Sequence, residues 1–223
     1  ASVLAAFEAG ELDALVPAAI LPGPSRPGLY SLLDNHSPWT LLPPLNVIFP
    51  VLHGTFGEDG TIQGLFELVD LAYVGAGVLG SSLGMDKGVF EAVMRAHHIP
   101  VVETKVFLRS ELQLDADGVL GRAEQVAPYP LFVKPANLGS SVGVSKCHSR
   151  SDLWEGLLEA ARFDRRILVQ RGVNAREIEV AVLGNDDPQA SMPGEILPSR
   201  EFYSYEAKYL DPEGAQMNIP AKL

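Results

Sequence analysis

The sequence contains a single cysteine, Cys147, among its 223 residues. One thiol can form neither an intrachain disulfide nor a thiolate metal cluster, and such usage is typical of a reducing compartment, so we expect a cytoplasmic protein. Positive charge is also scarce, because 17 Lys and Arg face 28 Asp and Glu, for a net charge of −11. A net negative charge repels nucleic acids and anionic membranes, which argues against a general binder of either. It does not exclude a local pocket that binds phosphate.

Long apolar runs are absent too, since none approaches the ~20 residues that a membrane-spanning helix needs. Residues 1–15 carry acidic side chains and no basic segment, so they do not resemble a signal peptide. The chain does have core-forming material, with 47% hydrophobic and 20% charged residues. That composition excludes wholesale disorder, and the length favours two ordinary domains.

Glycine and proline divide the first third of the chain into short elements. Residues 3–7 and 12–16 look helical, and the proline-rich stretch that follows predicts short strands near Ile20 and Leu41. Residues 46–52 form a nearly unbroken apolar run, which predicts a strand buried on both faces, although Pro50 weakens it.

A helical stripe over residues 61–70 and a short strand at 71–74 complete a strand–helix–strand order, which favours a parallel pair. Beyond Gly84, Asp86 is a candidate helix cap and another amphipathic helix begins at Ser151. The pattern of apolar residues predicts further strands, at residues 101–108, 131–134, 142–147, 167–170 and 178–183, the last with a period of two.

Residues 75–80, Gly-Ala-Gly-Val-Leu-Gly, match the glycine pattern of dinucleotide-binding turns. A functional match needs a helix that opens at the second glycine and an acid about 20 residues later. We expect Ser81, Ser82 and Gly84 to interrupt such a helix, and position 95 is an arginine. The stretch is therefore interpreted as a flexible connection between domains, which disfavours a nicotinamide-dependent oxidoreductase.

The turn at residues 53–60, His-Gly-Thr-Phe-Gly-Glu-Asp-Gly, follows a predicted buried strand and precedes a predicted helix. Ligands of open α/β sheets bind at such places, and we expect the helix start at Thr61 to offer free N–H groups to an anion. His53 either lies near an anionic ligand or simply closes the strand.

A stronger signal is the lysine that ends the apolar run of residues 131–133. Lys134 is costly to desolvate unless it meets an anion, and the glycine–serine loop 139–143 that follows can cradle phosphate with its backbone N–H groups. No Gly-Lys-Ser/Thr follows, so this is not a Walker A loop. The alternative is a plain hairpin with a solvent-facing lysine.

Two later segments are open to two interpretations. Residues 170–173 with Glu177 are either a sheet connection or a backbone edge for adenine with a carboxylate for ribose. Residues 201–211, which contain Lys208 and Tyr209, are either a surface hairpin or a lid.

In order along the chain, these segments resemble the D-alanine–D-alanine ligase family of the ATP-grasp superfamily. The agreement runs from about Val47 to the end and includes six motifs: the turn at 53–60, Tyr73-Val-Gly-Ala-Gly, Met85-Asp86-Lys87, Val133-Lys134-Pro135, Gly139-Ser-Ser-Val-Gly143 and Tyr205-Glu-Ala-Lys-Tyr209. The resemblance implies an α/β ATP-grasp fold with a Rossmann-like N-terminal domain. We expect a substrate domain at 1–75, a small ATP-grasp domain at 76–169, and the start of the C-terminal ATP-grasp domain at 170–223.

The resemblance also implies roles for individual residues. Those expected at ATP are Lys87, Lys134, Ser140, Ser141, Gln170, Arg171, Val173, Glu177 and Lys208. Ser140 and Tyr209 would fix the second substrate, His53 would lie near the first D-alanine, and Ser140, Lys208 and Tyr209 would serve catalysis. The implied reaction is phosphoryl transfer from ATP to D-alanine, followed by attack of a second D-alanine on the acyl phosphate, for peptidoglycan synthesis. A homodimer without nucleic-acid or membrane partners is expected.

Three departures from the family pattern qualify this expectation. The segment expected to contact adenine begins with Gln170-Arg171, where the family usually has an acid followed by lysine. The glycine-rich N-terminal strand, with its substrate-binding glutamate, has no counterpart. The Mg²⁺ ligands are expected beyond Leu223, with none within the chain, so we expect a partial chain that does not turn over alone. D-alanine–D-lactate ligase, D-alanine–D-serine ligase and an inactive nucleotide-binding fragment are the alternatives, and Tyr209 favours the dipeptide.

Overall fold

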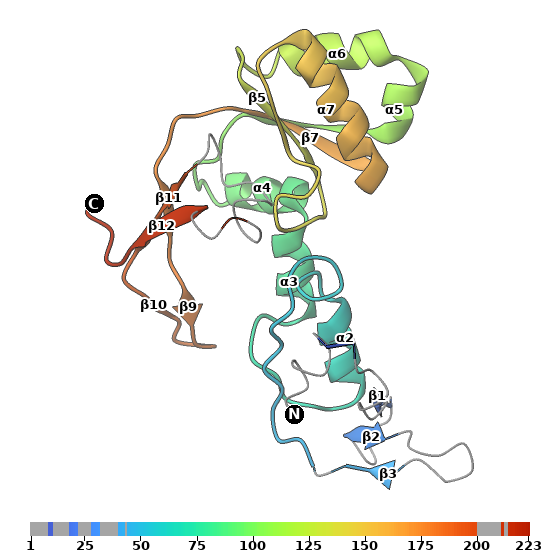
Figure 1. Ribbon diagram of the computed structural model, residues 1–223, viewed down its shortest axis with the longest axis vertical. Helices are drawn as coiled ribbons and strands as arrows, with labels where there is room; N and C mark the ends of the chain where they lie inside the picture. The colour runs from blue at the N-terminus through green and yellow to red at the C-terminus, as the bar shows by residue number, and fades with distance from the viewer. Residues whose placement is uncertain are drawn as a thin grey trace. The chain divides into compact units, whose positions relative to one another are not determined.

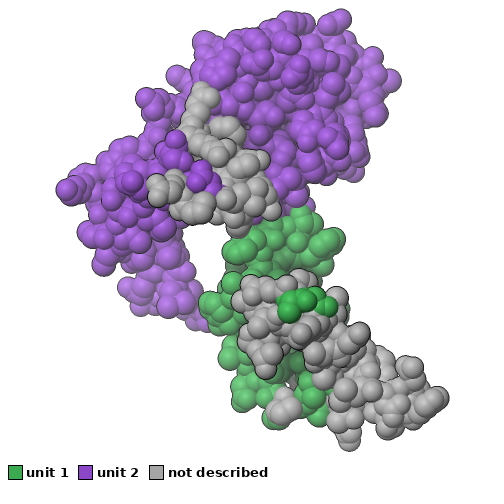
Figure 2. Space-filling model, viewed as in Figure 1, with its two compact units in different colours: residues 1–82 green, residues 83–223 purple. Residues whose placement is uncertain are grey.

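The computed structural model describes residues 9–10, 18–21, 28–31, 40–42, 44–199, 211 and 214–223. The chain divides into two compact units, residues 1–82 and 83–223, which are coloured separately in Figure 2. The helices expected at 3–7 and 12–16 lie outside the described residues, as does the expected lid apart from Asp211.

The first unit opens with a small antiparallel sheet in the order β1-β2-β3 (Figure 1). Its strands are β1 (Ala18–Ile20), β2 (Leu29–Ser31) and β3 (Thr40–Leu41). The strands expected near Ile20 and Leu41 are therefore confirmed. The sequence pattern gave no indication of β2, which is only three residues long.

A parallel strand–helix–strand unit follows, in reduced form. Ile48 and Tyr73 make one parallel bridge, with Ile48 N donating to Ala72 O and Val74 N donating to Ile48 O. Helix α2 (Thr61–Leu68) lies between them in sequence and buries Phe66. The parallel order is confirmed.

The expectation that residues 46–52 are buried on both faces is wrong. Val47, Phe49 and Val51 are 56%, 70% and 68% exposed. Only one bridge holds this segment, and Pro50 has no N–H with which to extend the ladder.

Helix α3 (Val78–Met85) begins directly after the second glycine of the Gly-x-Gly pattern. The expectation that Ser81, Ser82 and Gly84 interrupt such a helix is therefore wrong. Ser81 Oγ donates to Ala76 O and Ser82 Oγ donates to Asp59 O, so both hydroxyls bond outside the helix rather than competing with it.

The second unit is built on a four-stranded antiparallel sheet in the order β4-β7-β5-β6 (Figure 1). Its strands are β4 (Thr104–Leu108), β5 (Leu131–Pro135), β6 (Ser145–Cys147) and β7 (Arg166–Arg171). Each strand falls within or close to a range expected from the sequence. The alternation of side chains gives the sheet two different faces.

One face of this sheet carries the core, which three helices cover. They are α5 (Arg109–Leu114), α6 (Ala116–Glu124) and α7 (Arg150–Phe163). Leu153, Leu157 and Ala160 of α7 are completely buried together with Val133 and Ile167 of the sheet. The sequence predicted α7 and missed α5 and α6.

Helix α4 (Lys87–Ala96) is the helix expected after Asp86. Asp86 is its N-cap, with Oδ1 accepting from Val89 N over 2.9 Å, as the sequence predicted. Lys87 N donates to Ala136 O beyond the end of β5, which joins the helix start to the sheet.

Beyond β7 the chain forms two smaller antiparallel units. One sheet has the order β12-β11-β8 and the other is the hairpin β9-β10. Their strands are β8 (Glu177–Glu179), β9 (Val182–Leu183), β10 (Gln189–Ala190), β11 (Gly194–Pro198) and β12 (Ala215–Asn218). Within the described part of the chain, no helix combines the length and apolar composition needed to cross a membrane.

Candidate functional site

The face of the four-stranded sheet opposite the core carries a row of polar and aromatic side chains. Gln170 on β7 is in register with Thr104 on β4 and with Phe132 on β5, and Phe132 is in register with Lys146 on β6. Lys134 stands two residues after Phe132 and therefore points to the same face. Residues 131, 133 and 135 point to the other face and are buried.

This face and its adjoining loops enclose a pocket of about 510 Å³. Its lining combines cations, hydroxyls and apolar side chains, and every lining residue belongs to the second unit. The charged and polar members are Lys87, Lys134, Ser140, Ser141, Gln170, Arg171 and Glu177. The larger apolar members are Met85, Val102, Phe132, Leu138, Val144 and Val173. Such a combination suits a ligand with an apolar body and an anionic group.

Lys134 lies in the wall of this pocket. Its Nζ donates to Gln170 Oε1 over 2.7 Å and lies 5.4 Å from the centroid of the Phe132 ring. Burial lowers the pKa of the Lys134 ammonium below its usual value, and the carboxylates of Glu91 and Glu177 oppose that change. An additional anion in the pocket would therefore stabilise the charged form of Lys134.

Lys87 reaches the pocket from the first residue of α4. Its Nζ donates to Leu138 O over 2.5 Å, immediately before the glycine–serine loop. Because the backbone of Lys87 is also bonded to Ala136, the helix start and the loop are tied at two points.

The loop at residues 139–143 has an unusual backbone. Ser140 and Ser141 both have positive φ angles, 54° and 58°, and Gly143 has a φ of 68°. Left-handed conformations are costly for residues with a Cβ, and successive residues of this kind occur where a loop is shaped for a ligand. The plain hairpin with a solvent-facing lysine does not describe this loop, since Lys134, Ser140 and Ser141 line one pocket.

The far wall of the pocket comes from the connection between β7 and β8. Gly172 N donates to Pro130 O over 2.9 Å, and a Cβ at Gly172 would come within 2.5 Å of that oxygen, so only glycine fits. Arg171 lines the pocket and also pairs with Glu103, with 3.2 Å between Nη1 and Oε1. Glu177 opens β8, as the sequence predicted.

Eight of the predicted nucleotide residues thus line one pocket: Lys87, Lys134, Ser140, Ser141, Gln170, Arg171, Val173 and Glu177. Lys208 and Tyr209 lie outside the described residues. His53 belongs to the first unit and is exposed.

The expected anion site at the start of α2 is not supported. Thr61 N donates to Asp59 Oδ1 over 3.0 Å, and Ile62 N donates to Phe56 O over 3.1 Å. The turn satisfies these two N–H groups itself, one with the Asp59 carboxylate and one with a backbone carbonyl, so neither is available to an anion.

Sequence reasoning missed the apolar part of the pocket, apart from Val173, and the carboxylate of Glu91. Phe132 was recoverable from strand alternation, because it must share the face of Lys134. Glu91 follows Lys87 by four residues on the same helix face, but that spacing alone does not distinguish it from a solvated glutamate.

No metal site is found among the described residues, because no three His, Cys, Asp or Glu side chains gather closely enough to hold an ion. Three of the four charged side chains that line the pocket are cations, so the lining does not suit Mg²⁺, which prefers carboxylate oxygens. The site of Mg²⁺ stays a prediction.

The antiparallel sheet with its covering helices, the glycine–serine loop and the pocket between them define a protein of the ATP-grasp class. Family models agree: "D-ala D-ala ligase C-terminus" matches residues 93–223 and "D-ala D-ala ligase N-terminus" matches residues 27–76. The chain belongs to the D-alanine–D-alanine ligase family.

Individual relatives point the same way. The chain is 52% identical over 179 residues to a D-alanine–D-alanine ligase of Acetivibrio thermocellus, an overlap of 80% of this chain and 47% of the relative. The solved structure of the VanG D-Ala:D-Ser ligase from Enterococcus faecalis matches with a TM-score of 0.79 and 30% identity, covering 97% of this chain and 59% of that one.

A D-alanine–D-alanine ligase structure from Coxiella burnetii matches with a TM-score of 0.70 and 36% identity, covering 87% of this chain and 53% of that one. The chain spans about half the length of the curated relatives it matches.

Proposed function

We propose that this protein joins two D-alanine molecules into D-alanyl-D-alanine, with ATP converted to ADP and phosphate. The observation that carries the proposal is the pocket of about 510 Å³, which gathers eight side chains that the family resemblance assigns to the nucleotide. The choice of reaction is based on relatives named D-alanine–D-alanine ligase, which are 46% to 52% identical to this chain.

For the nucleotide, the apolar side chains around Phe132 hold the base and the backbone of residues 170–173 meets its edge. Glu177 accepts hydrogen bonds from the ribose. Lys87 and Lys134 offset phosphate charge, while the loop with Ser140 and Ser141 covers the triphosphate. Catalysis of this kind depends on positioning and charge neutralisation rather than on a protein nucleophile.

The reaction has two balanced steps. A carboxylate oxygen of the first D-alanine attacks the γ-phosphorus, and ADP leaves with the bonding electron pair. The amine of the second D-alanine then attacks the acyl phosphate, phosphate leaves, and the amine loses a proton. We assign His53 to the first D-alanine, and Ser140, Lys208 and Tyr209 to the transferred phosphate and the second D-alanine.

The wider context of the proposal follows the family. We propose Mg²⁺ as the metal, a cytoplasmic homodimer as the working form and peptidoglycan precursor synthesis as the role. The proposed division into functional parts is residues 1–75 for substrate binding, 76–169 for the small nucleotide domain and 170–223 for the beginning of the larger one.

D-Serine is the second candidate acceptor, because one structural neighbour is a D-Ala:D-Ser ligase with a TM-score of 0.79. Identity to that protein is 30%, whereas it is 52% to a D-alanine–D-alanine ligase. D-Alanine is therefore favoured.

The test is a coupled assay of ADP release by the complete gene product, with D-alanine, D-serine, D-lactate, L-alanine or no amino acid. We expect release that depends on D-alanine and forms the dipeptide. Equal rates with L-alanine, or without any amino acid, would contradict the proposal. Binding of a fluorescent ATP analogue to the chain itself tests the nucleotide part separately.

A further inference from the structure

A carboxylate lies behind the pocket wall, separated from Lys134 by one side chain. Gln170 Oε1 accepts from Lys134 Nζ over 2.7 Å, and Gln170 Nε2 donates to Glu91 Oε1 over 2.8 Å. The Glu91 side chain is only 13% exposed, and Glu91 is not part of the pocket lining. The amide of Gln170 thus lies between an ammonium and a carboxylate.

The orientation of this amide is imposed by its neighbours. An ammonium can only donate and a carboxylate can only accept, so the oxygen of Gln170 must face Lys134 and the nitrogen must face Glu91. Thr104 fits the same order, because its Oγ1 accepts from Gln170 Nε2 over 3.1 Å and donates to Val102 O over 3.3 Å. Every hydrogen bond in this series from Lys134 to Glu91 and Val102 therefore joins one donor to one acceptor.

The arrangement follows from helix spacing and strand register. Lys87 and Glu91 stand four residues apart in α4, so the helix face that brings Lys87 to the pocket also brings Glu91 to the sheet. Gln170 lies opposite Thr104 in the antiparallel register, so its amide lies within reach of both Thr104 and α4.

Lys134 forms no direct ion pair with the residues that the structure describes. Among the described residues, its only hydrogen bond goes to the neutral amide of Gln170. An ammonium has three N–H donors, so this contact leaves two for other acceptors. A carboxylate bound directly to Lys134 would occupy donors that a phosphate needs.

We infer that Glu91 is a positioning residue for the nucleotide: acting through Gln170, it supplies the counter-charge of Lys134 while leaving the ammonium's remaining donors to the phosphates. The inference rests on the proposed nucleotide site and adds to it a residue outside the pocket.

The charged groups around Lys134 decide the sign of its response to pH. Lys87, Arg171 and Glu177 line the same pocket, and Lys146 lies 5.8 Å from the centroid of the Phe132 ring that Lys134 also faces. Burial lowers the pKa of Lys134, and Glu91 is the first of the two carboxylates that raise it. Without the Glu91 charge that pKa falls further, so the ammonium is lost at a lower pH.

The experiment measures affinity of the chain for a fluorescent ATP analogue from about pH 7 to about pH 10. In the wild type, affinity falls on the alkaline side as Lys134 loses its proton. Glu91→Gln keeps an acceptor for Gln170 but removes the charge, and its alkaline midpoint moves down by about one pH unit. Glu91→Asp retains the charge and the wild-type midpoint.

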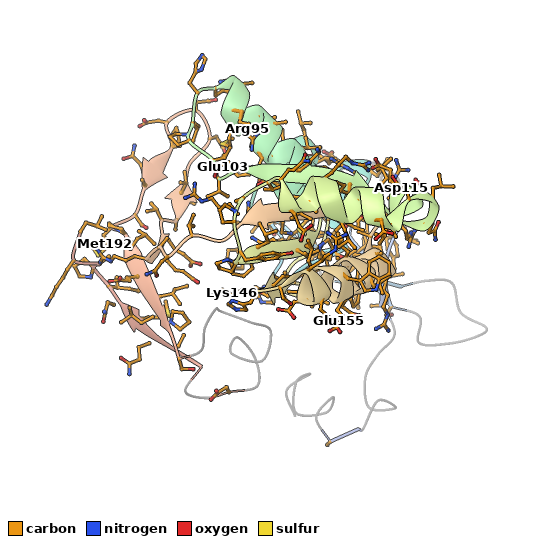
Figure 3. All side chains as sticks on the ribbon, turned by 90° about the horizontal axis from the view of Figure 1, so that it is seen from above. Arg95, Glu103, Asp115, Lys146, Glu155 and Met192 are labelled. Atoms are coloured by element: carbon orange, nitrogen blue, oxygen red, sulfur yellow. The ribbon has the colours of Figure 1, made fainter. Side chains whose placement is uncertain are left out.

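The control is Glu155→Gln, an equal change of charge in the same unit. Glu155 is exposed on α7, which covers the opposite face of the sheet, and Figure 3 labels it there. Its midpoint should match the wild type. When Lys134→Met is already present, adding Glu91→Gln should not change the pH dependence of affinity relative to Lys134→Met alone.

The outcomes separate the two proposals. A folded Glu91→Gln protein with an unshifted midpoint overturns the inference alone. So does an equal shift in Glu155→Gln, or a shift that persists in the Lys134→Met background. A wild-type chain that binds no ATP analogue at any pH overturns the nucleotide site, and the inference with it. Thermal unfolding of each variant shows whether a loss of affinity is a loss of fold.

Discussion

Arg166, at the start of β7, forms an ion pair with Asp86, the N-cap of α4, which lies 80 positions earlier in the chain. The two side chains are 28% and 19% exposed, so the pair is partly shielded from water. Asp86 therefore has two roles, because one oxygen caps the helix and the other holds it to the sheet. Lys87 is the next residue and lines the pocket, so this contact helps to fix the helix start that carries it.

Substitution of Asp86 separates its two roles. Asp86→Asn keeps a capping side chain but loses the ion pair, and we expect a loss of about 1–2 kcal/mol in unfolding free energy. Asp86→Ala also removes the cap, for about 1 kcal/mol more. Both variants should bind ATP analogue more weakly because Lys87 is less well placed.

Urea unfolding and nucleotide titration measure the two effects. Asp117→Asn is the control, since Asp117 is 98% exposed and pairs with Arg150 only at 3.7 Å. Its effect on stability should stay within about 0.5 kcal/mol. Wild-type stability in Asp86→Asn would contradict the role given to the ion pair.

Replacement of Lys134 by methionine tests the pocket directly. Methionine keeps the packing of the stem and removes the charge. Loss of one partner of a sheltered charge pair costs about 2–5 kcal/mol, or about 30- to 4,000-fold in nucleotide affinity. Folding stability should change little, because removal of a desolvated ammonium offsets the lost hydrogen bond to Gln170.

Affinity for ATP analogue and thermal unfolding are measured in parallel. If a folded Lys134→Met variant bound nucleotide like the wild type, Lys134 would have no place in the site. Lys105→Met is a suitable control, because Lys105 is exposed and does not line this pocket.

A methyl group at Gly143 should distort the glycine–serine loop. Gly143 has a φ of 68°, and a Cβ there would lie 2.7 Å from the Phe163 ring and 2.9 Å from Pro135 Cγ. We expect Gly143→Ala to lose about 2 kcal/mol of stability and to weaken nucleotide binding, because both the backbone and the packing resist the side chain.

Gly121→Ala is the matched control within α6. Nothing lies within 4 Å of a Cβ at Gly121, so the same substitution should stabilise the protein by about 0.5–1 kcal/mol. Chemical denaturation distinguishes the two directions. Equal effects at both positions would show that the loop geometry is not what matters.

Cys147 should make folding sensitive to alkaline pH. Burial raises the pKa of the Cys147 thiol from about 9 to about 11. The native state therefore keeps its proton where the unfolded state releases it, so stability is complete below about pH 9 and declines as pH rises toward about 11. Cys147→Ala lacks this contribution and should show a shallower decline.

Urea unfolding between about pH 8 and pH 10 provides the comparison. Burial and the hydrogen bond to Glu124 also raise the pKa of Tyr129, to about 12, so higher pH would mix the titration of two groups. Identical slopes in wild type and Cys147→Ala would exclude the thiol as the cause.

The sequence predicted the second unit better than the first. Strand β5 alternates between buried and partly buried residues, and β7 contains the buried apolar run Ile167–Val169, so their positions follow from local pattern. Helices α5 and α6 are short, with six and nine residues, and their burial in the core shared with α7 is a tertiary effect. The apolar run around Phe49 gave the wrong prediction of a strand buried on both faces, because hydrophobicity alone does not reveal whether partner strands are present.

Most residues of the nucleotide pocket were predicted by combining sequence motifs. Glu91, which lies behind the pocket, could be identified only from the structure. Lys134 and the serine loop stand out in sequence because a lysine ends an apolar strand before glycine and serine. Glu91 has no such signal, because a glutamate in an amphipathic helix is ordinarily a solvated residue. Within its own helix Glu91 lies 3.7 Å from Arg95, and only the approach of α4 to the sheet also joins that carboxylate to Gln170.

The two-faced sheet has a consequence for how this chain can vary in length. Insertion or deletion of one residue within β5 would exchange Val133 and Lys134, turning an ammonium toward the core and a valine toward the nucleotide pocket. The β9–β10 hairpin has no such constraint, since Asp186 and Asp187 at its turn are exposed. Changes of length should therefore accumulate at the hairpin and be excluded from β5.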